Sequence, residues 1–248
     1  MRLIDRWVGI PLCFFASFWP LKKAQADSNS TLATNIPPPD TIVFIGIAEI
    51  GALVVAYPAI KETRKQHPKS RICFITAPAG VQTLELMGFE KEDIFLLETS
   101  SIKSLLKGIV NIRSHFKGGR VSAIVLEPFT RFSTLLSAWI GASKRIGCYR
   151  FLNEGVFLGN ILTHRLVYNP HLHISQTYFA LAKALIEPDS AKPLLKEYIP
   201  SQIKNRLKIN IPEKEQQTLM KRLQSECPEN PLKKIILLNA NASDIVPL

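Results

Sequence analysis

The sequence contains few cysteines, and no two of them lie close together. Cys13, Cys73, Cys148 and Cys227 are widely separated, and no Cys-x-x-Cys pair occurs. A disulfide framework or a zinc site requires closer or patterned cysteines, so the sequence supports neither. Cys73 lies within an apolar run that is typical of a buried strand, and its expected role is packing. This use of cysteine fits a reducing compartment best.

Acidic residues are scarce relative to basic ones. The chain has 31 Lys and Arg against 20 Asp and Glu, a formal net charge of +11. Such an excess favours anionic partners: nucleic acid, anionic lipid headgroups, or phosphorylated sugars and nucleotides. Nucleic acid is the weakest of these, because the sequence lacks a basic helix, a zinc spacing and an aromatic ribonucleoprotein motif. The hydrophobic content of 46% supplies ample core and excludes disorder for most of the length.

The first 26 residues contain an apolar stretch from Trp7 to Leu21, with two prolines inside it. About 20 residues are needed to cross the hydrocarbon core, so the stretch is short for a full span. Its terminal tryptophans and flanking cations predict an interfacial or re-entrant anchor at the cytoplasmic face of the inner membrane. A secretory signal cleaved after Ala26 and a buried helix are the alternatives. Two lysines directly before the cleavage-like site count against the signal, and residues 27–40 are expected to form a Pro-rich linker.

From residue 41 onward, short apolar runs alternate with stretches whose apolar residues recur at helical spacing. This alternation predicts an α/β fold with a doubly wound, Rossmann-like parallel sheet in residues 41–190. A helical segment, 191–232, is expected to follow, and then a strand and loop, 233–248, that only begin a second domain. The runs that are typical of strands covered on both faces are Ile42–Ile45, Ile72–Ile75, Ile94–Leu97 and Val121–Leu126.

The loop after the first expected strand, Gly46 to Ala52, is the first candidate site. Ligands of an open parallel sheet bind at loops beyond the carboxyl ends of its strands. The loop has glycines but matches neither GxGxxG nor a phosphate-binding loop. Glu49 is its one ionisable residue and is a candidate general base for a sugar hydroxyl, the alternative being a cap of the following helix. Gly51 and Ala52 are expected to contact an acceptor.

Two later loops also carry polar candidates. Glu127 and Arg131 either bind a polar acceptor or pair with each other at a helix start. His171 and His173 precede a helix and are expected to contact an acceptor phosphate or to cap that helix. No convergent Asp, Glu or Cys set accompanies them, so a metal site is not expected. Four cations are candidates to meet phosphate, with solvated surface as the alternative: Lys144, Arg145, Arg150 and Arg165.

Four segments, in this order, carry a resemblance to a known family. They are TIVFIGIAEIGALVVAYPAI (41–60), GASKRIGCYR (141–150), LTHRLVYNPHLHISQTYFAL (162–181) and IILLNANASD (235–244). Each is loose alone, but their order and spacing resemble glycosyltransferase family 9, the ADP-heptose:lipopolysaccharide heptosyltransferases. The acidic residue of the family's first loop aligns with Ala52 here, so Glu49 is the expected replacement base.

The resemblance implies a GT-B architecture, with the acceptor in the first domain and a nucleotide sugar in the second. It implies a metal-independent, inverting transferase without a cofactor, whose donor is ADP-heptose or another nucleotide sugar. Asn239, Asn241 and Ser243 would then contact the donor diphosphate. The expected function is transfer of a heptose-like sugar to a lipopolysaccharide core or other surface-glycan acceptor.

The second domain is expected to be C-terminally truncated, so this chain is not expected to turn over by itself. Two other functions stay open at this point. One is a non-catalytic, membrane-associated domain that binds a glycolipid or a partner. The other is an exported binding protein, which requires cleavage after Ala26.

Overall fold

The computed structural model describes residues 9–18, 38–47, 50–149, 156–187 and 211–226. The chain divides into two compact units, Met1–Leu207 and Lys208–Leu248. The described part of the second unit is dominated by one helix, α8 (Glu213–Glu226), which buries none of its residues. The predicted boundaries at residues 26, 190 and 232 fall within or beside segments outside the described residues, and stay predictions.

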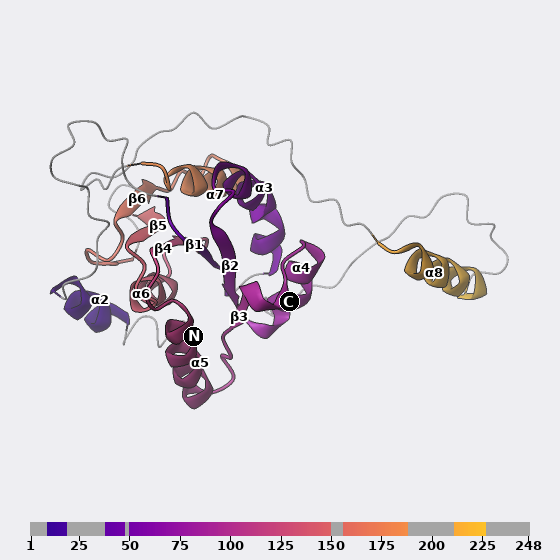
Figure 1. The fold of residues 1–248 in the computed structure, drawn as a ribbon, viewed down its shortest axis with the longest axis horizontal. Helices are drawn as coiled ribbons and strands as arrows, with labels where there is room; N and C mark the ends of the chain where they lie inside the picture. Colours follow the sequence, from indigo (N-terminus) through magenta and orange to yellow (C-terminus); the bar gives the residue numbers. More distant parts are fainter. Residues whose placement is uncertain (1–8, 19–37, 48–49, 150–155, 188–210, 227–248) are drawn as a thin grey trace, which may run out of the picture. The chain divides into compact units, whose positions relative to one another are not determined.

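A six-stranded sheet forms the centre of the first unit. Its strands lie in the order β3-β2-β1-β4-β5-β6, and all five pairings between neighbours are parallel (Figure 1). This is the strand order of a doubly wound Rossmann-like sheet, so the predicted α/β fold class is confirmed. The strands are β1 (Thr41–Ile45), β2 (Arg71–Thr76), β3 (Ile94–Leu96), β4 (Val121–Val125), β5 (Lys144–Tyr149) and β6 (His164–Val167).

Helices cover both faces of the sheet, which explains why the central strands are apolar on both sides. One face packs against α3 (Ile50–Gln66), α4 (Val81–Leu86) and α7 (Ile174–Lys183) around Phe44 and Phe74. The other face packs against α5 (Ile102–His115) and α6 (Arg131–Trp139). Two short 3-10 helices, η1 (Pro78–Gly80) and η2 (Lys91–Asp93), directly precede α4 and β3.

The predicted N-terminal membrane anchor at the inner membrane is wrong. Among the described residues, no helix has the length and apolar character needed to span a bilayer. The apolar stretch instead contributes a helix of ten residues, α2 (Gly9–Phe18), which lies beside α6 (Figure 1). Cys13 of α2 is fully buried, and the Ser17 hydroxyl accepts a hydrogen bond of 3.0 Å from the Asn160 backbone N–H. Part of the apolar character of this stretch therefore serves packing within the protein.

We expect Gly159→Ala to loosen α2 from the rest of the unit. Gly159 has φ of +58°, and a Cβ there would lie 2.8 Å from the Cys13 carbonyl oxygen and still closer to the Ser17 hydroxyl. The left-handed backbone alone costs a non-glycine residue about 1–2 kcal/mol, and the clash adds to that cost. Hydrogen exchange of the peptide that spans α2 should therefore speed up.

Gly88→Ala is the matched control for this change. Gly88 has φ of +80°, but a Cβ there would meet nothing within 4 Å. It should show a similar backbone cost without faster exchange in α2. Equal exchange of α2 in the two variants would mean that Gly159 does not govern the docking of this helix.

Candidate functional site

The strand order places the candidate site where β1 and β4 lie side by side. From β1 the chain continues to β2 on one side, while from β4 it continues to β5 on the other, so the order reverses between them. Ile45 pairs with Val125 at the carboxyl ends of these two strands. Ligands of open α/β sheets bind in the crevice at such a reversal. The loops that follow β1 and β4, both singled out from the sequence, therefore leave the sheet next to each other.

Glu127 joins these two loops. Its Oε1 accepts a hydrogen bond of 2.7 Å from the backbone N–H of Ile47, and its Oε2 accepts one from the Ser133 hydroxyl in the first turn of α6. Ile47 is 8% exposed and Ser133 is 0% exposed, so both donors are shielded from water. The positive end of the α6 dipole also favours a carboxylate here. The described contacts make Glu127 a tether between loops, and direct acceptor binding by it stays a prediction.

Arg131, the first residue of α6, is buried. It is 7% exposed, and its Nε donates a hydrogen bond of 3.1 Å to the carbonyl oxygen of Phe157. Between Glu127 and Arg131, Phe129 has φ of 61°, the one positive φ of a non-glycine residue among the described residues. Both flanks of this left-handed residue are thus fixed by side-chain hydrogen bonds.

The two predicted histidines lie after β6. The backbone N–H of Ser175 donates to His173 Nδ1 at 3.2 Å, and the backbone N–H of His173 donates to Gln176 Oε1 at 3.1 Å. His173 therefore caps α7, which is the alternative role considered for it. His171 is exposed, and its backbone N–H donates to Asn169 Oδ1 at 3.0 Å. No group of three or more potential metal ligands occurs in the described part of the chain.

The loop after β1 is described only in part. Gly46 lies tightly against the core, since a Cβ there would be 3.0 Å from Leu53 Cδ2. Gly51 is exposed, with open space where a side chain would project, and Ala52 packs at the edge of the core. Glu49 falls outside the described residues. The same holds for the three predicted donor contacts, Asn239, Asn241 and Ser243.

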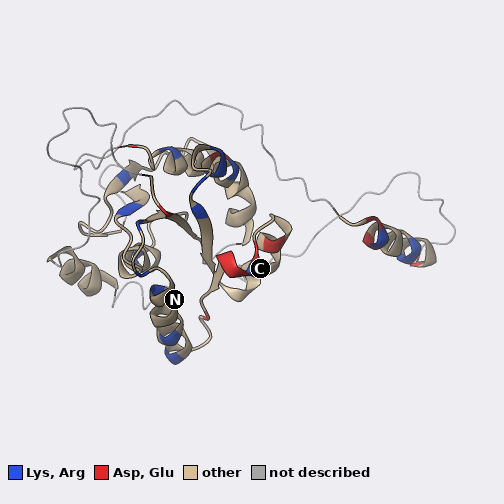
Figure 2. Cartoon of the chain, viewed as in Figure 1, with Lys and Arg blue, Asp and Glu red and all other residues tan. Residues whose placement is uncertain are grey.

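Lys144 and Arg145 are neither solvated nor free to meet a phosphate in this structure. The Lys144 ammonium donates to the carbonyl oxygens of Leu185 and Glu187 at 2.9 and 2.8 Å, at the C-terminal end of α7, where a cation is favoured. Arg145 is 1% exposed and donates through Nε to the carbonyl oxygen of Ile161 at 2.6 Å. Among the described residues, Figure 2 shows the other Lys and Arg distributed over several elements.

Burial also removes two cysteines from consideration as nucleophiles. It raises the pKa of both the Cys73 and the Cys148 thiol to about 12, because the thiolate is poorly solvated inside the sheet. A nucleophilic cysteine needs the thiolate near neutral pH. Both residues therefore serve packing, as expected for Cys73.

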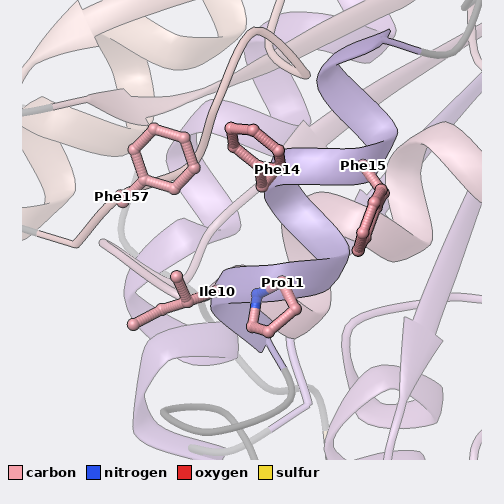
Figure 3. A pocket seen from close by; sticks show the side chains of 5 residues that line it. All are labelled: Ile10, Pro11, Phe14, Phe15 and Phe157. Carbon is pink, nitrogen blue, oxygen red and sulfur yellow. The ribbon is translucent and has the colours of Figure 1, made fainter.

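A depression lined only by apolar side chains lies on α2. Ile10, Pro11, Phe14 and Phe15 line it together with Phe157 of the segment before β6 (Figure 3). It offers no polar side chain that could orient a substrate. It is therefore distinct in chemistry from the polar site beside β1 and β4.

The sequence gives no indication that Phe129 or Tyr168 belongs to the candidate site. Tyr168 directly follows β6, and its ring meets the Phe129 ring edge to face at a centroid distance of 5.4 Å. This contact brings the loop after β6 to the loop after β4. No local sequence signal announces it, because the two residues are far apart in the chain and Phe is an unusual choice for a left-handed position.

No protein-family model and no curated protein matches this sequence. The structure is similar to the crystal structure of a glycosyl transferase of family 9 from Veillonella parvula, with a TM-score of 0.54 and 17% identity. That match covers 77% of this chain and 51% of the other, so this chain spans about half the length of the solved structure. Its identity is low, and it establishes the fold alone.

A further similarity is to the E. coli heptosyltransferase WaaC with ADP-2-deoxy-2-fluoro heptose, at 10% identity and a TM-score of 0.49. It covers 61% of this chain and 50% of that one.

Proposed function

We propose that this chain forms the acceptor-binding part of a glycosyltransferase. The reaction would move a sugar, heptose or a relative, from a nucleoside diphosphate donor to a hydroxyl of a lipopolysaccharide-core or other surface-glycan acceptor. The observation that carries this proposal is the Glu127 tether, which holds the loop after β1 against the loop after β4 at the reversal of strand order. The fold similarity to a family 9 glycosyl transferase supports the same class of reaction.

In the proposed mechanism, Glu49 accepts the proton of the acceptor hydroxyl. The acceptor oxygen then bonds to the anomeric carbon while the bond from that carbon to the diphosphate breaks, and the electron pair leaves with the nucleoside diphosphate. Configuration inverts in such a single displacement, and neither a metal nor a cofactor is required. Asn239, Asn241 and Ser243 are proposed to contact the donor diphosphate, with ADP-heptose or another nucleotide sugar as donor.

The test uses the full natural polypeptide that carries this sequence. It is incubated with ADP-, UDP- and GDP-sugars, ADP-heptose among them, and with core oligosaccharide released from the source cells. We expect release of nucleoside diphosphate that depends on the oligosaccharide, a mass gain of one sugar on the acceptor, and no loss of rate in EDTA. Oligosaccharide binding without any release would instead favour the second candidate, a non-catalytic glycolipid-binding domain.

A matched pair of variants in the same assay tests the base. Glu49→Gln should lower kcat by about 100-fold or more, the usual contribution of a general base. Glu98→Gln is the control, because Glu98 is an exposed carboxylate that follows β3 at the same edge of the sheet. Unchanged turnover in Glu49→Gln would remove Glu49 from the mechanism.

A further inference from the structure

Phe129 and Tyr168 form an aromatic pair at the carboxyl edge of the sheet. Phe129 belongs to the loop after β4 and Tyr168 to the loop after β6. Their rings meet at an interplanar angle of 79°, and both residues are only partly buried. Tyr168 also packs against the core shared with α3 and α7, which fixes its position. The pair therefore presents firmly held aromatic surface on the side of the sheet where ligands are expected.

The backbone at Phe129 is strained, and the strain is maintained from both sides. A bulky residue in the left-handed region is an outlier, whereas glycine would adopt the same φ without cost. Two residues before Phe129, the Glu127 carboxylate accepts hydrogen bonds from Ile47 and Ser133. Two residues after it, Arg131 donates a hydrogen bond to the carbonyl oxygen of Phe157. Strain of this kind persists where surroundings enforce it, and it gathers at ligand sites. The use of Phe in place of Gly points to a role for the ring.

The chemistry of the pair suits a carbohydrate ring. Aromatic faces pack well against the apolar C–H face of a sugar, and a phenol can bond to its hydroxyls. The Tyr168 hydroxyl makes no hydrogen bond with any residue that the structure describes. Beside the pair, both carboxylate oxygens of Glu127 accept hydrogen bonds from the protein. Recognition by the pair itself would therefore rest on stacking and one hydroxyl.

We propose that Phe129 and Tyr168 form a stacking subsite for a sugar ring of the acceptor glycan, and that they determine acceptor affinity. This inference rests on the proposed function, since it names the ligand class at the same edge of the sheet. A donor adenine is the other ligand that such a pair could stack against. The proposed donor contacts, Asn239, Asn241 and Ser243, are distant in sequence from the pair. The binding of acceptor and the binding of donor can therefore be measured separately in variants of the pair.

The experiment measures binding and turnover on the full natural polypeptide. The probes are core oligosaccharide released from the source cells, free of lipid, and ADP alone. Phe129→Leu and Tyr168→Leu should each weaken oligosaccharide binding about tenfold or more, as expected for one lost stacking contact, and leave ADP binding unchanged. If the wild-type protein transfers sugar, the same variants should raise KM for the acceptor and leave kcat within about threefold.

Phe129→Tyr keeps the strained backbone and the ring, so it should retain the affinity that Phe129→Leu loses. Trp139→Leu removes an exposed aromatic at the other end of α6 and should change neither constant. Weaker binding of ADP, or unchanged binding of oligosaccharide in the leucine variants, would overturn the subsite. Binding of oligosaccharide without turnover would refute the transferase and still leave the subsite decided by the affinities.

Discussion

Replacing Arg145 with methionine is expected to lower the free energy of unfolding by about 3 kcal/mol. Arg145 is 1% exposed, and its guanidinium donates to the carbonyl oxygens of Ile161 and Ala142. Each buried carbonyl left without its donor costs about 1–3 kcal/mol. Removal of the desolvated cation offsets part of that cost. Methionine fills much of the same volume, so the expected loss comes from hydrogen bonds and not from a cavity.

Urea unfolding measures this effect, with the midpoint falling and the slope unchanged. Arg165→Met on the neighbouring strand is the control. Arg165 is partly exposed, donates to Asn160 Oδ1 at 2.9 Å and stacks on the Tyr149 ring. Its loss should cost less than about 1 kcal/mol. If Arg145→Met loses as little stability as Arg165→Met, water or another donor must satisfy the carbonyl oxygens that the guanidinium leaves.

Arg145 also shows why the burial of charged residues in β5 and β6 could not be predicted from the sequence. The first four strands follow from their apolar runs, because both faces of those strands are covered by helices. β5 begins with Lys144 and Arg145, and β6 with His164, residue types that are usually solvated. They are buried because backbone carbonyls at the end of α7 and in the segment before β6 accept their hydrogen bonds. Those partners are distant in sequence, so no local pattern predicts them.

The candidate site, like the strands, was predictable only in part. The location of the site in the loops after the strands follows from the general rule for parallel sheets. His173 caps α7, which was one of its two expected roles. The contact that joins the loops is between Glu127 and Ile47, 80 residues apart in the chain. Its existence depends on β1 and β4 being neighbours, which the alternation of strands and helices does not specify. The left-handed backbone of Phe129 is likewise a product of tertiary contacts.

Replacing Glu127 with alanine is expected to lower the free energy of unfolding by about 2–4 kcal/mol, because two buried donors lose a charged acceptor. These are the backbone N–H of Ile47 and the hydroxyl of Ser133. The loop after β1 would also lose its link to β4, so transfer should fall well beyond the effect on stability. Urea unfolding and acceptor turnover at a temperature where the variant stays folded measure the two effects separately.

Glu127→Gln separates the tether from a direct role of the charge. Glutamine has the same shape, and its Oε1 can accept from Ile47 while its amide donates to the Ser133 oxygen. If Glu127 acts by holding the loops, this variant should lose about 1 kcal/mol of stability and keep most of the turnover, since only the charge assistance is gone. Ser133→Ala, which removes one of the two hydrogen bonds, should fall between glutamine and alanine in both measurements. A glutamine variant that is as stable as the wild type but as inactive as the alanine variant would contradict the tether. It would indicate that the Glu127 carboxylate itself binds the acceptor.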